Sequence, residues 1–105
     1  MKLYAFLDVD RSRRRPSPRL RQVLARAGFN PFGRLANTFW RDIGIHAPVH
    51  FDGIAAILAA DLDAIKSPRH RRGVILLVAP DLDRRVQSIG FIDGELRRAA
   101  WCTAA

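Results

Sequence analysis

Two short runs of this chain are apolar at every position. Residues 3–7 read Leu-Tyr-Ala-Phe-Leu, and residues 74–79 read Val-Ile-Leu-Leu-Val-Ala. Runs of this length and composition predict strands, and the absence of polar alternation predicts that both faces of each strand are covered. With 105 residues the chain has room for a single core. The fold must therefore contain one sheet that is buried from both sides.

Two segments show the apolar spacing of amphipathic helices. The first begins at Ser17 or Pro18 and ends at Gly28, a residue type that commonly follows a helix. The second begins with Asp52 as its N-cap and is closed by Ser67-Pro68. The expected buried positions are Leu20, Val23, Leu24 and Ala27 in the first helix, and Ile54, Ile57, Leu58, Leu62 and Ile65 in the second.

Shorter stretches complete the expected sheet. Residues 34–40 and 85–92 are interpreted as strands, and 45–51 as a short partner strand weakened by Pro48. After the Asp93-Gly94 turn, residues 96–103 form a short strand or a tail. The order β-α-β-(β)-α-β-β predicts an α+β protein with a ferredoxin-like arrangement, in which both helices cover one face of an antiparallel sheet. Residues 1–92 would make the domain, and 93–105 a C-terminal strand or tail.

The helix-free face of such a sheet also needs a cover. The first strand and residues 74–79 point apolar side chains to both sides, but helices occupy only one side. For so small a chain the most economical cover is a second copy. We therefore expect a homodimer packed sheet to sheet.

The charge of the chain favours an anionic partner. The net charge is +8, and because only Lys2 and Lys66 are lysines, the other sixteen basic residues are arginines. Guanidinium groups bind phosphate bidentately, so we expect a nucleic-acid or nucleotide-phosphate partner and not a membrane surface. The chain has no apolar run near the roughly 20 residues that span a bilayer, and one cysteine, Cys102. These features favour a cytoplasmic protein.

The first strand ends in carboxylates and runs into an arginine-rich loop. Asp8 and Asp10 follow the apolar run, and the loop then reads Arg-Ser-Arg-Arg-Arg over residues 11–15. Carboxylates bind hard divalent cations, and arginines bind phosphates. Asp8 is thus a candidate metal ligand with Asp10 in support. The alternative is that Asp8 only pairs with an arginine such as Arg11 or Arg14.

The order of these segments resembles a known family. Leu7-Asp8-Val9 ends the first strand, Arg-Leu-Arg-Gln-Val at 19–23 lies in a basic helix that ends near Gly28-Phe29, and 84–90 read Arg-Arg-Val-Gln-Ser-Ile-Gly. In order and spacing, residues 2–91 resemble the small CRISPR-associated adaptation endonucleases. These are the second of the two core spacer-acquisition proteins and are related to VapD-like ribonucleases.

The resemblance implies a mechanism and a set of partners. In such a homodimer the two Asp8 carboxylates would face each other across the two-fold axis and hold one Mg²⁺ or Mn²⁺ per dimer. Asp8 would then be the catalytic residue of a metal-dependent endonuclease that hydrolyses phosphodiesters in DNA or RNA. The same dimer would bridge two dimers of a CRISPR integrase subunit and hold duplex DNA with its basic residues during spacer acquisition, an antiviral function.

Several arginines are candidates for the nucleic-acid-binding surface, although a solvated run of charge is the alternative for each. The first group surrounds the end of the first strand and comprises Arg11, Arg13, Arg14, Arg15, Arg19 and Arg21. A second group comprises Arg69, Arg71, Arg72, Arg84, Arg85, Arg97 and Arg98, of which Arg97 and Arg98 stand where the resemblance implies DNA contacts. Backbone contacts of this kind carry no base specificity.

There are three alternative functions, of which the residues disfavour the second. A stand-alone VapD-like endoribonuclease toxin would use the same Asp8. An RNA-recognition module shares the β-α-β order but needs exposed aromatic residues on its two central strands, and residues 74–78 supply none. A non-enzymatic basic protein that binds a nucleic acid or nucleoprotein partner is the third. Trp40 and Phe32 are expected in the core or the dimer interface.

Overall fold

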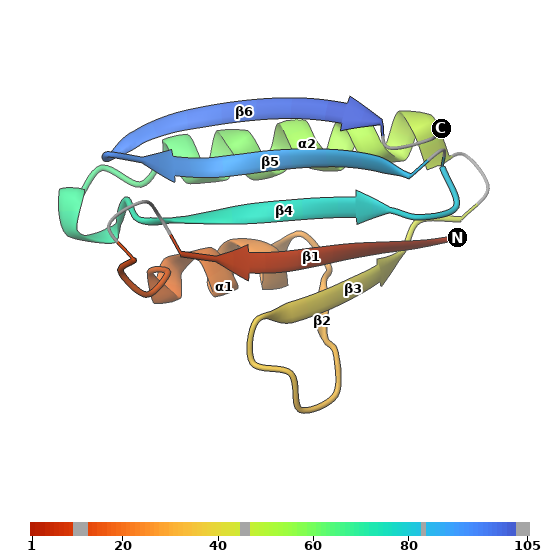
Figure 1. Ribbon diagram of the computed structural model, residues 1–105, viewed down its shortest axis with the longest axis horizontal. Helices are drawn as coiled ribbons and strands as arrows, with labels where there is room; N and C mark the ends of the chain where they lie inside the picture. Colours follow the sequence, from red (N-terminus) through yellow and green to blue (C-terminus); the bar gives the residue numbers. More distant parts are fainter. Residues whose placement is uncertain (10–12, 45–46, 83, 103–105) are drawn as a thin grey trace.

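The computed structural model describes residues 1–9, 13–44, 47–82 and 84–102. Its elements, shown in Figure 1, are β1 (Lys2–Asp8), α1 (Pro18–Arg26), β2 (Asn30–Pro31), β3 (Thr38–Asp42), α2 (Ala47–Asp63), a 3₁₀ turn η1 (Pro68–His70), β4 (Gly73–Ala79), β5 (Arg85–Ile92) and β6 (Glu95–Cys102). The expected α+β class is confirmed.

All strands belong to one antiparallel sheet in the order β2-β3-β1-β4-β5-β6. β1 lies between β3 and β4, so the β3–α2–β4 connection passes over β1. The first four strands of that order are compatible with a ferredoxin-like fold, in which the strand after the first helix is here reduced to the two residues of β2. β5 and β6 extend the sheet beyond that plan.

The middle of the chain corrects two predictions. The strand expected at 34–40 lies later, at Thr38–Asp42. The partner strand expected at 45–51 is wrong over 47–51, because α2 begins at Ala47, and residues 45 and 46 lie outside the described residues. Proline is tolerated in the first turn of a helix, where its missing N–H has no intrahelical acceptor, so Pro48 fits this start. Asp52 consequently lies inside α2 and is not its N-cap.

The two helices cover one face of the sheet, as expected (Figure 1). Leu3, Ala5 and Leu7 of β1 point to this face and are buried against it, as are Ile75 and Leu77 of β4. The helix α1 starts at Ser17, whose hydroxyl accepts a hydrogen bond from the Arg19 N–H at 3.2 Å, and Pro18 follows at N1. All four predicted apolar positions of α1 are buried.

The opposite, open face of the sheet is largely apolar. Tyr4 and Phe6 of β1 and Val74, Leu76 and Val78 of β4 alternate with the core residues and are only partly buried. Apolar side chains thus point to both sides of these strands, as predicted. The second copy that was expected to cover the open face stays a prediction.

The C-terminal segment is a full strand. β6 pairs with β5 along its whole length, and the hairpin turns through Asp93 and Gly94, whose φ angles are +54° and +79°. Two successive positive φ values are typical of the tight hairpin turns that favour Asp-Gly. β6 forms one edge of the sheet, and the short β2 forms the other (Figure 1).

Candidate nucleic-acid interface

Asp8 lies on the open face of the sheet at the end of β1. Side chains alternate along a strand, so Asp8 is on the same side as Tyr4 and Phe6, opposite Val74 of β4. The carboxylate is exposed, and its Oδ1 accepts a hydrogen bond from the Val9 N–H at 2.8 Å. Most of its oxygen lone pairs are therefore available to a ligand.

The predicted metal site is shared by two copies of the chain and stays a prediction. Among residues 1–9, 13–44, 47–82 and 84–102 no three His, Cys, Asp or Glu side chains are grouped to hold a metal ion. The predicted supporting residue Asp10, like Arg11, falls outside the described residues. A divalent cation at Asp8 thus needs further oxygen ligands from another molecule or from water.

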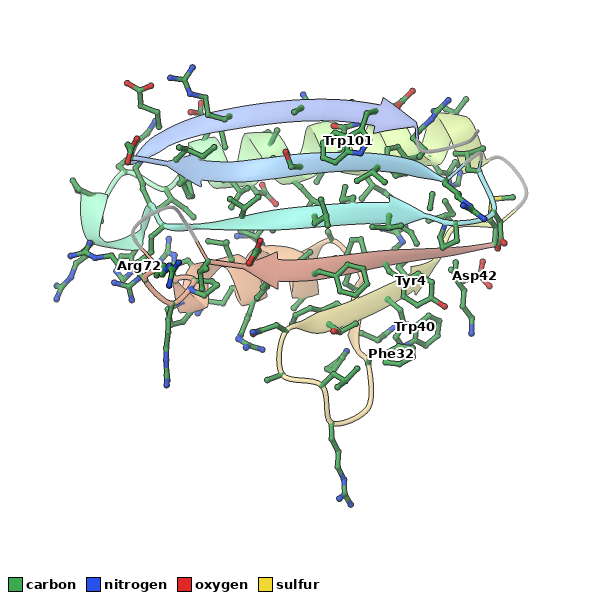
Figure 2. The ribbon with its side chains drawn as sticks, in the orientation of Figure 1. Tyr4, Phe32, Trp40, Asp42, Arg72 and Trp101 are labelled. Atoms are coloured by element: carbon green, nitrogen blue, oxygen red, sulfur yellow. The ribbon has the colours of Figure 1, made fainter. Side chains whose placement is uncertain are left out.

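Two arginine-rich segments meet beside Asp8. The Ser17 N–H donates a hydrogen bond to the Arg72 carbonyl at 3.1 Å, and the Ser17 hydroxyl lies 3.4 Å from Nδ1 of His70. A Cβ placed on Gly73 would lie only 2.8 Å from Cβ of Pro16, so the segments 13–17 and 69–73 are in close contact. Figure 2 shows Arg72 at this end of the sheet. The fold therefore gathers arginines that are more than 50 positions apart in the sequence.

These arginines divide into exposed and structural ones. The side chains of Arg13, Arg14, Arg15, Arg19 and Arg69 are exposed. Arg71 instead donates to the carbonyls of Gly94 at 2.8 Å and Ile65 at 2.7 Å, and its guanidinium lies 4.7 Å from the ring centre of Phe91. Arg71, which the sequence placed in the second group of candidate phosphate ligands, thus stabilises the fold.

A pocket of about 490 Å³ opens next to the end of β1. Its lining residues are Val9, Arg15, Pro16, Arg21, Ala36 and Asn37. Nη2 of Arg21 donates a 2.7 Å hydrogen bond to Oδ1 of Asn37, and the guanidinium lies 5.7 Å from the Phe39 ring centre. Arg15 and Arg21 were predicted phosphate ligands. Asn37 was missed, because nothing local in the sequence distinguishes it from other strand-flanking polar residues.

The N-terminus of α1 adds to the positive potential at this end. The first turn of the helix contains no acidic residue, and Arg19 is exposed there. A helix N-terminus carries a partial positive charge that favours anions. Helix, loops and pocket thus all favour a phosphate at the same end of the sheet.

Arg97 and Arg98 point to opposite faces of the sheet. The register Asp8–Val74–Gly90–Arg97 places Arg97 in the same row as Asp8 on the open face, three strands away or about 14 Å. Arg97 pairs with Glu95 at 2.6 Å, whereas Arg98 donates to Oε1 of Gln87 at 3.0 Å. Arg97 thus shares the open face with Asp8, and Arg98 does not.

The other end of the open face is aromatic. The rings of Tyr4 and Phe32 meet edge to face at 5.9 Å, and Nζ of Lys2 lies 5.3 Å from the ring centre of Trp40 (Figure 2). Tyr4 and Phe6 are on β1 and Trp40 is on β3, the two central strands of the ferredoxin-like order. The sequence-based objection to an RNA-recognition module concerned residues 74–78. These residues lie in β4, which is not one of the two central strands of that module, so the objection does not apply.

Comparisons with known proteins name no relative. No protein-family model, no curated protein and no solved structure matches this chain. No helix among the described residues is long and apolar enough to cross a membrane.

Proposed function

We propose that this chain binds the phosphate backbone of a nucleic acid at the end of β1. The observation that carries the proposal is the meeting of segments 13–17 and 69–73 beside the pocket that contains Arg15 and Arg21. With no sequence-specific hydrogen-bonding pattern in the pocket, the contacts would position a strand and would not read its bases.

The pocket suits a phosphodiester for three reasons. Two guanidinium groups supply multiple donors in the fork geometry that matches phosphate oxygens. Asn37 holds one end of Arg21 through the 2.7 Å hydrogen bond, which reduces the side-chain entropy that is lost on binding. Among the described residues, the rest of the lining, which includes Val9, Pro16 and Ala36, carries no carboxylate.

The salt dependence of binding tests this proposal. Fluorescence anisotropy with a labelled 20-mer, single-stranded and duplex, DNA and RNA, should give a linear fall of log K with log salt. Arg15→Gln and Arg21→Gln should each weaken binding and reduce the slope by about 0.7 to 0.9. Arg26→Gln removes the same charge from the far end of α1 and is the matched control. Equal slopes for Arg15→Gln, Arg21→Gln and the native chain would refute the assignment.

We further propose that two copies pack through their open faces and that the paired Asp8 residues bind one Mg²⁺ or Mn²⁺. The supports are the apolar character of the open face and the presence of Asp8 on it. A metal held there would polarise a phosphate oxygen or activate water for phosphodiester hydrolysis. This arrangement would serve both the CRISPR adaptation subunit and the VapD-like ribonuclease that the sequence resemblance implies.

Sedimentation and metal titration separate these possibilities. A dimer that binds about one Mn²⁺ per two chains, and loses the metal in Asp8→Asn while keeping nucleic-acid affinity, would support the metal-dependent endonuclease. Cleavage of RNA without a partner protein, with growth arrest on expression, would favour the toxin over the adaptation subunit. A monomer whose RNA affinity falls in Tyr4→Ala and Trp40→Ala would favour an RNA-recognition module and exclude the paired Asp8 site.

A further inference from the structure

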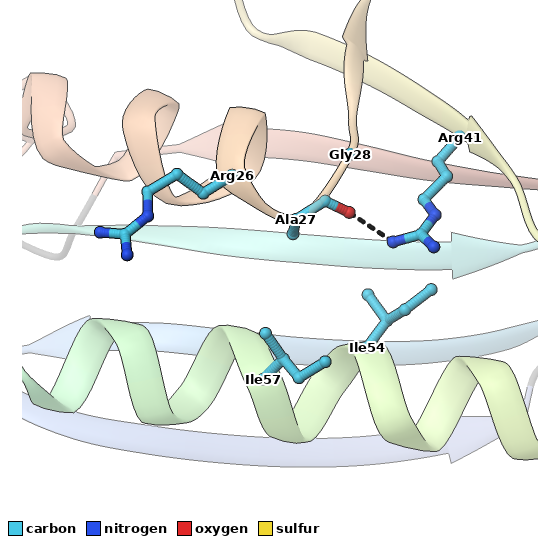
Figure 3. A pocket seen from close by; sticks show the side chains of 6 residues that line it. All are labelled: Arg26, Ala27, Gly28, Arg41, Ile54 and Ile57. Carbon is cyan, nitrogen blue, oxygen red and sulfur yellow. Dashed lines mark hydrogen bonds between the residues drawn. The ribbon is translucent and has the colours of Figure 1, made fainter.

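A second pocket lies on the helix-covered side, between the C-terminal end of α1, β3 and α2 (Figure 3). Its volume is about 480 Å³, and its lining residues are Arg26, Ala27, Gly28, Arg41, Ile54 and Ile57. The nine residues of α1 separate it from the N-cap at Ser17, which is about 13 Å away along the helix. It is therefore distinct from the proposed nucleic-acid site.

Arg41 is fixed in position at one side of this pocket. It extends from β3 and is partly buried, and its Nη1 donates a hydrogen bond to the carbonyl of Ala27, the C-cap residue of α1 (Figure 3). Gly28, with φ of +86°, makes room for it, because a Cβ there would lie 3.3 Å from Nη1. The guanidinium is thus preorganised, and one hydrogen bond leaves most of its five N–H donors available.

Arg26 also lines the pocket, but its side chain extends away from Arg41 (Figure 3), and it lines a neighbouring pocket together with Asp61. It is exposed in the last turn of α1 and makes no hydrogen bond or ion pair with any residue that the structure describes. Among the described residues, the lining of the pocket includes no Asp or Glu. The guanidinium of Arg41 therefore favours an anionic group at the pocket, and Arg26 adds a second positive charge farther along α1.

The side of the pocket formed by α2 is apolar and continues along the helix. Ile54 is buried, whereas Ile57 is 54% exposed. Val49 is 75% exposed, and with Gly53 and Ile57 it forms a row at i, i+4 and i+8 on the solvent side of α2. This row spans about 12 Å, which is the length of two turns of a helix. A solvent-facing row of this kind is unusual for a surface helix, whose outer side is normally polar.

We propose that the Arg26–Arg41 pocket and the Val49–Ile57 row bind an acidic amphipathic helix of a partner protein. Aliphatic side chains of that helix would contact Ile54, Ile57 and Val49, and separate carboxylates of the same helix would bind Arg41 and Arg26. A bare phosphate backbone matches the arginines but leaves the exposed isoleucine and valine uncovered. Charge and apolar surface together therefore favour a protein segment as the ligand. This segment would be bound at the C-terminal end of α1 while the N-terminal end of α1 binds nucleic acid.

Two synthetic probes test this proposal. Both are 15-residue labelled peptides with leucine at i, i+3, i+4 and i+7 and the same helix-forming alanines; one carries four flanking glutamates and the other four lysines. Anisotropy with the full chain should show saturable binding of the glutamate peptide only. Arg26→Gln should weaken it about fivefold, since a charge-assisted hydrogen bond is lost. Ile57→Glu should weaken it at least about tenfold, by lost apolar burial and like-charge repulsion.

The controls separate this site from the nucleic-acid site. Arg15→Gln removes one positive charge at the other end of α1 and should leave peptide affinity within about twofold, because a charge more than one Debye length away is largely screened. Arg26 and Ile57 are exposed, so both variants should fold, as circular dichroism would show. Equal binding of the two peptides, no binding of the glutamate peptide, an unchanged affinity in Ile57→Glu, or displacement of the peptide by an equimolar oligonucleotide would each overturn the proposal.

Discussion

The two pockets of this protein both contain a pair of arginines, yet their surroundings differ. Beside β1, Arg15 and Arg21 are accompanied by Asn37, and the lining also includes Val9, the residue that follows Asp8. Between the helices, Arg26 and Arg41 adjoin isoleucine side chains instead. A pair of guanidinium groups by itself specifies only that the ligand is an anion. The neighbouring residues decide whether that anion is a solvated phosphodiester or a carboxylate carried on an apolar segment.

The pockets also depend on glycines in different ways. Gly73 supports the pocket beside β1, because the Pro16 backbone packs directly over it. Gly28 supports the pocket between the helices, where the nearest atoms belong to the Arg41 side chain. Backbone cannot move without disturbing its neighbours, whereas a long side chain can rotate. Substitution by alanine should therefore destabilise the protein more at Gly73 than at Gly28.

The largest effect is expected for Gly73→Ala. Its φ of +103° is unfavourable for alanine, and the new Cβ would lie 2.8 Å from Pro16 Cβ and 2.9 Å from Pro16 Cα. We expect the free energy of unfolding to fall by about 3 kcal/mol, from backbone strain and overpacking together. Urea denaturation measures it. Gly94→Ala is the control, since φ there is +79° but no atom lies within 4 Å; an equal loss in both would show that the Pro16 contact is unimportant.

Arg71→Gln should have the next largest effect. The substitution removes hydrogen bonds to the carbonyls of Gly94 and Ile65 and the stacking on Phe91. We expect a loss of about 2 kcal/mol in unfolding free energy, as for a partly buried charged donor. Arg69→Gln, two residues away and exposed, should leave stability within about 0.5 kcal/mol. If Arg69→Gln were the more destabilising, the division into structural and exposed arginines would be wrong.

Gly28→Ala should cost less than Gly73→Ala. The φ of +86° is strained for alanine, and this alone accounts for about 1 kcal/mol. The 3.3 Å approach of the new Cβ to Nη1 can be relieved by a small shift of Arg41. Thermal denaturation measures the stability of the variant, and anisotropy with the glutamate peptide measures its affinity for the peptide. A loss as large as that of Gly73→Ala would mean that Arg41 is held rigidly and that the two pockets do not differ in this respect.

The parts of the fold that were predictable from sequence are those fixed by local patterns. The apolar runs that form β1 and β4, the cap and stop of α1, and the Asp93-Gly94 turn all specify their structure within a few residues. The segment 45–51 does not, since a short apolar run suits either a helix or a strand. In the folded protein this segment is helical from Ala47 onward, as the start of α2.

The candidate sites were predictable only in part, for a related reason. Arginines at 15 and 21 were evident from charge density near the end of β1, and the structure brings both to one pocket. The partner Asn37 and the second arginine pair depend on how β3 packs across α1, which joins residues far apart in the chain. Arg41 in isolation reads as an ordinary strand residue. Only its contact with the Ala27 carbonyl distinguishes it.

The smallest effect concerns Asp42, at the end of β3 away from the basic loops. A hydrogen bond from the Gly44 N–H, at 2.9 Å, and the Met1 ammonium, at 3.3 Å, hold the pKa of this carboxyl below its ordinary value of 3.8. Because the folded pKa is depressed, the carboxylate adds stability above the unfolded pKa, and this is lost as the pH falls through the folded pKa.

Asp42→Asn tests this link between pH and stability without touching either pocket. The variant should be slightly less stable than the native chain at neutral pH, and the difference should disappear once the pH falls below the folded pKa of Asp42. Urea denaturation across an acid pH series measures the difference, and high salt should reduce it because the pair is exposed. A difference that grows toward acid pH would mean that Asp42 is destabilising when ionised. Unchanged nucleic-acid and peptide affinities in this variant would show that Asp42 takes no part in either binding function.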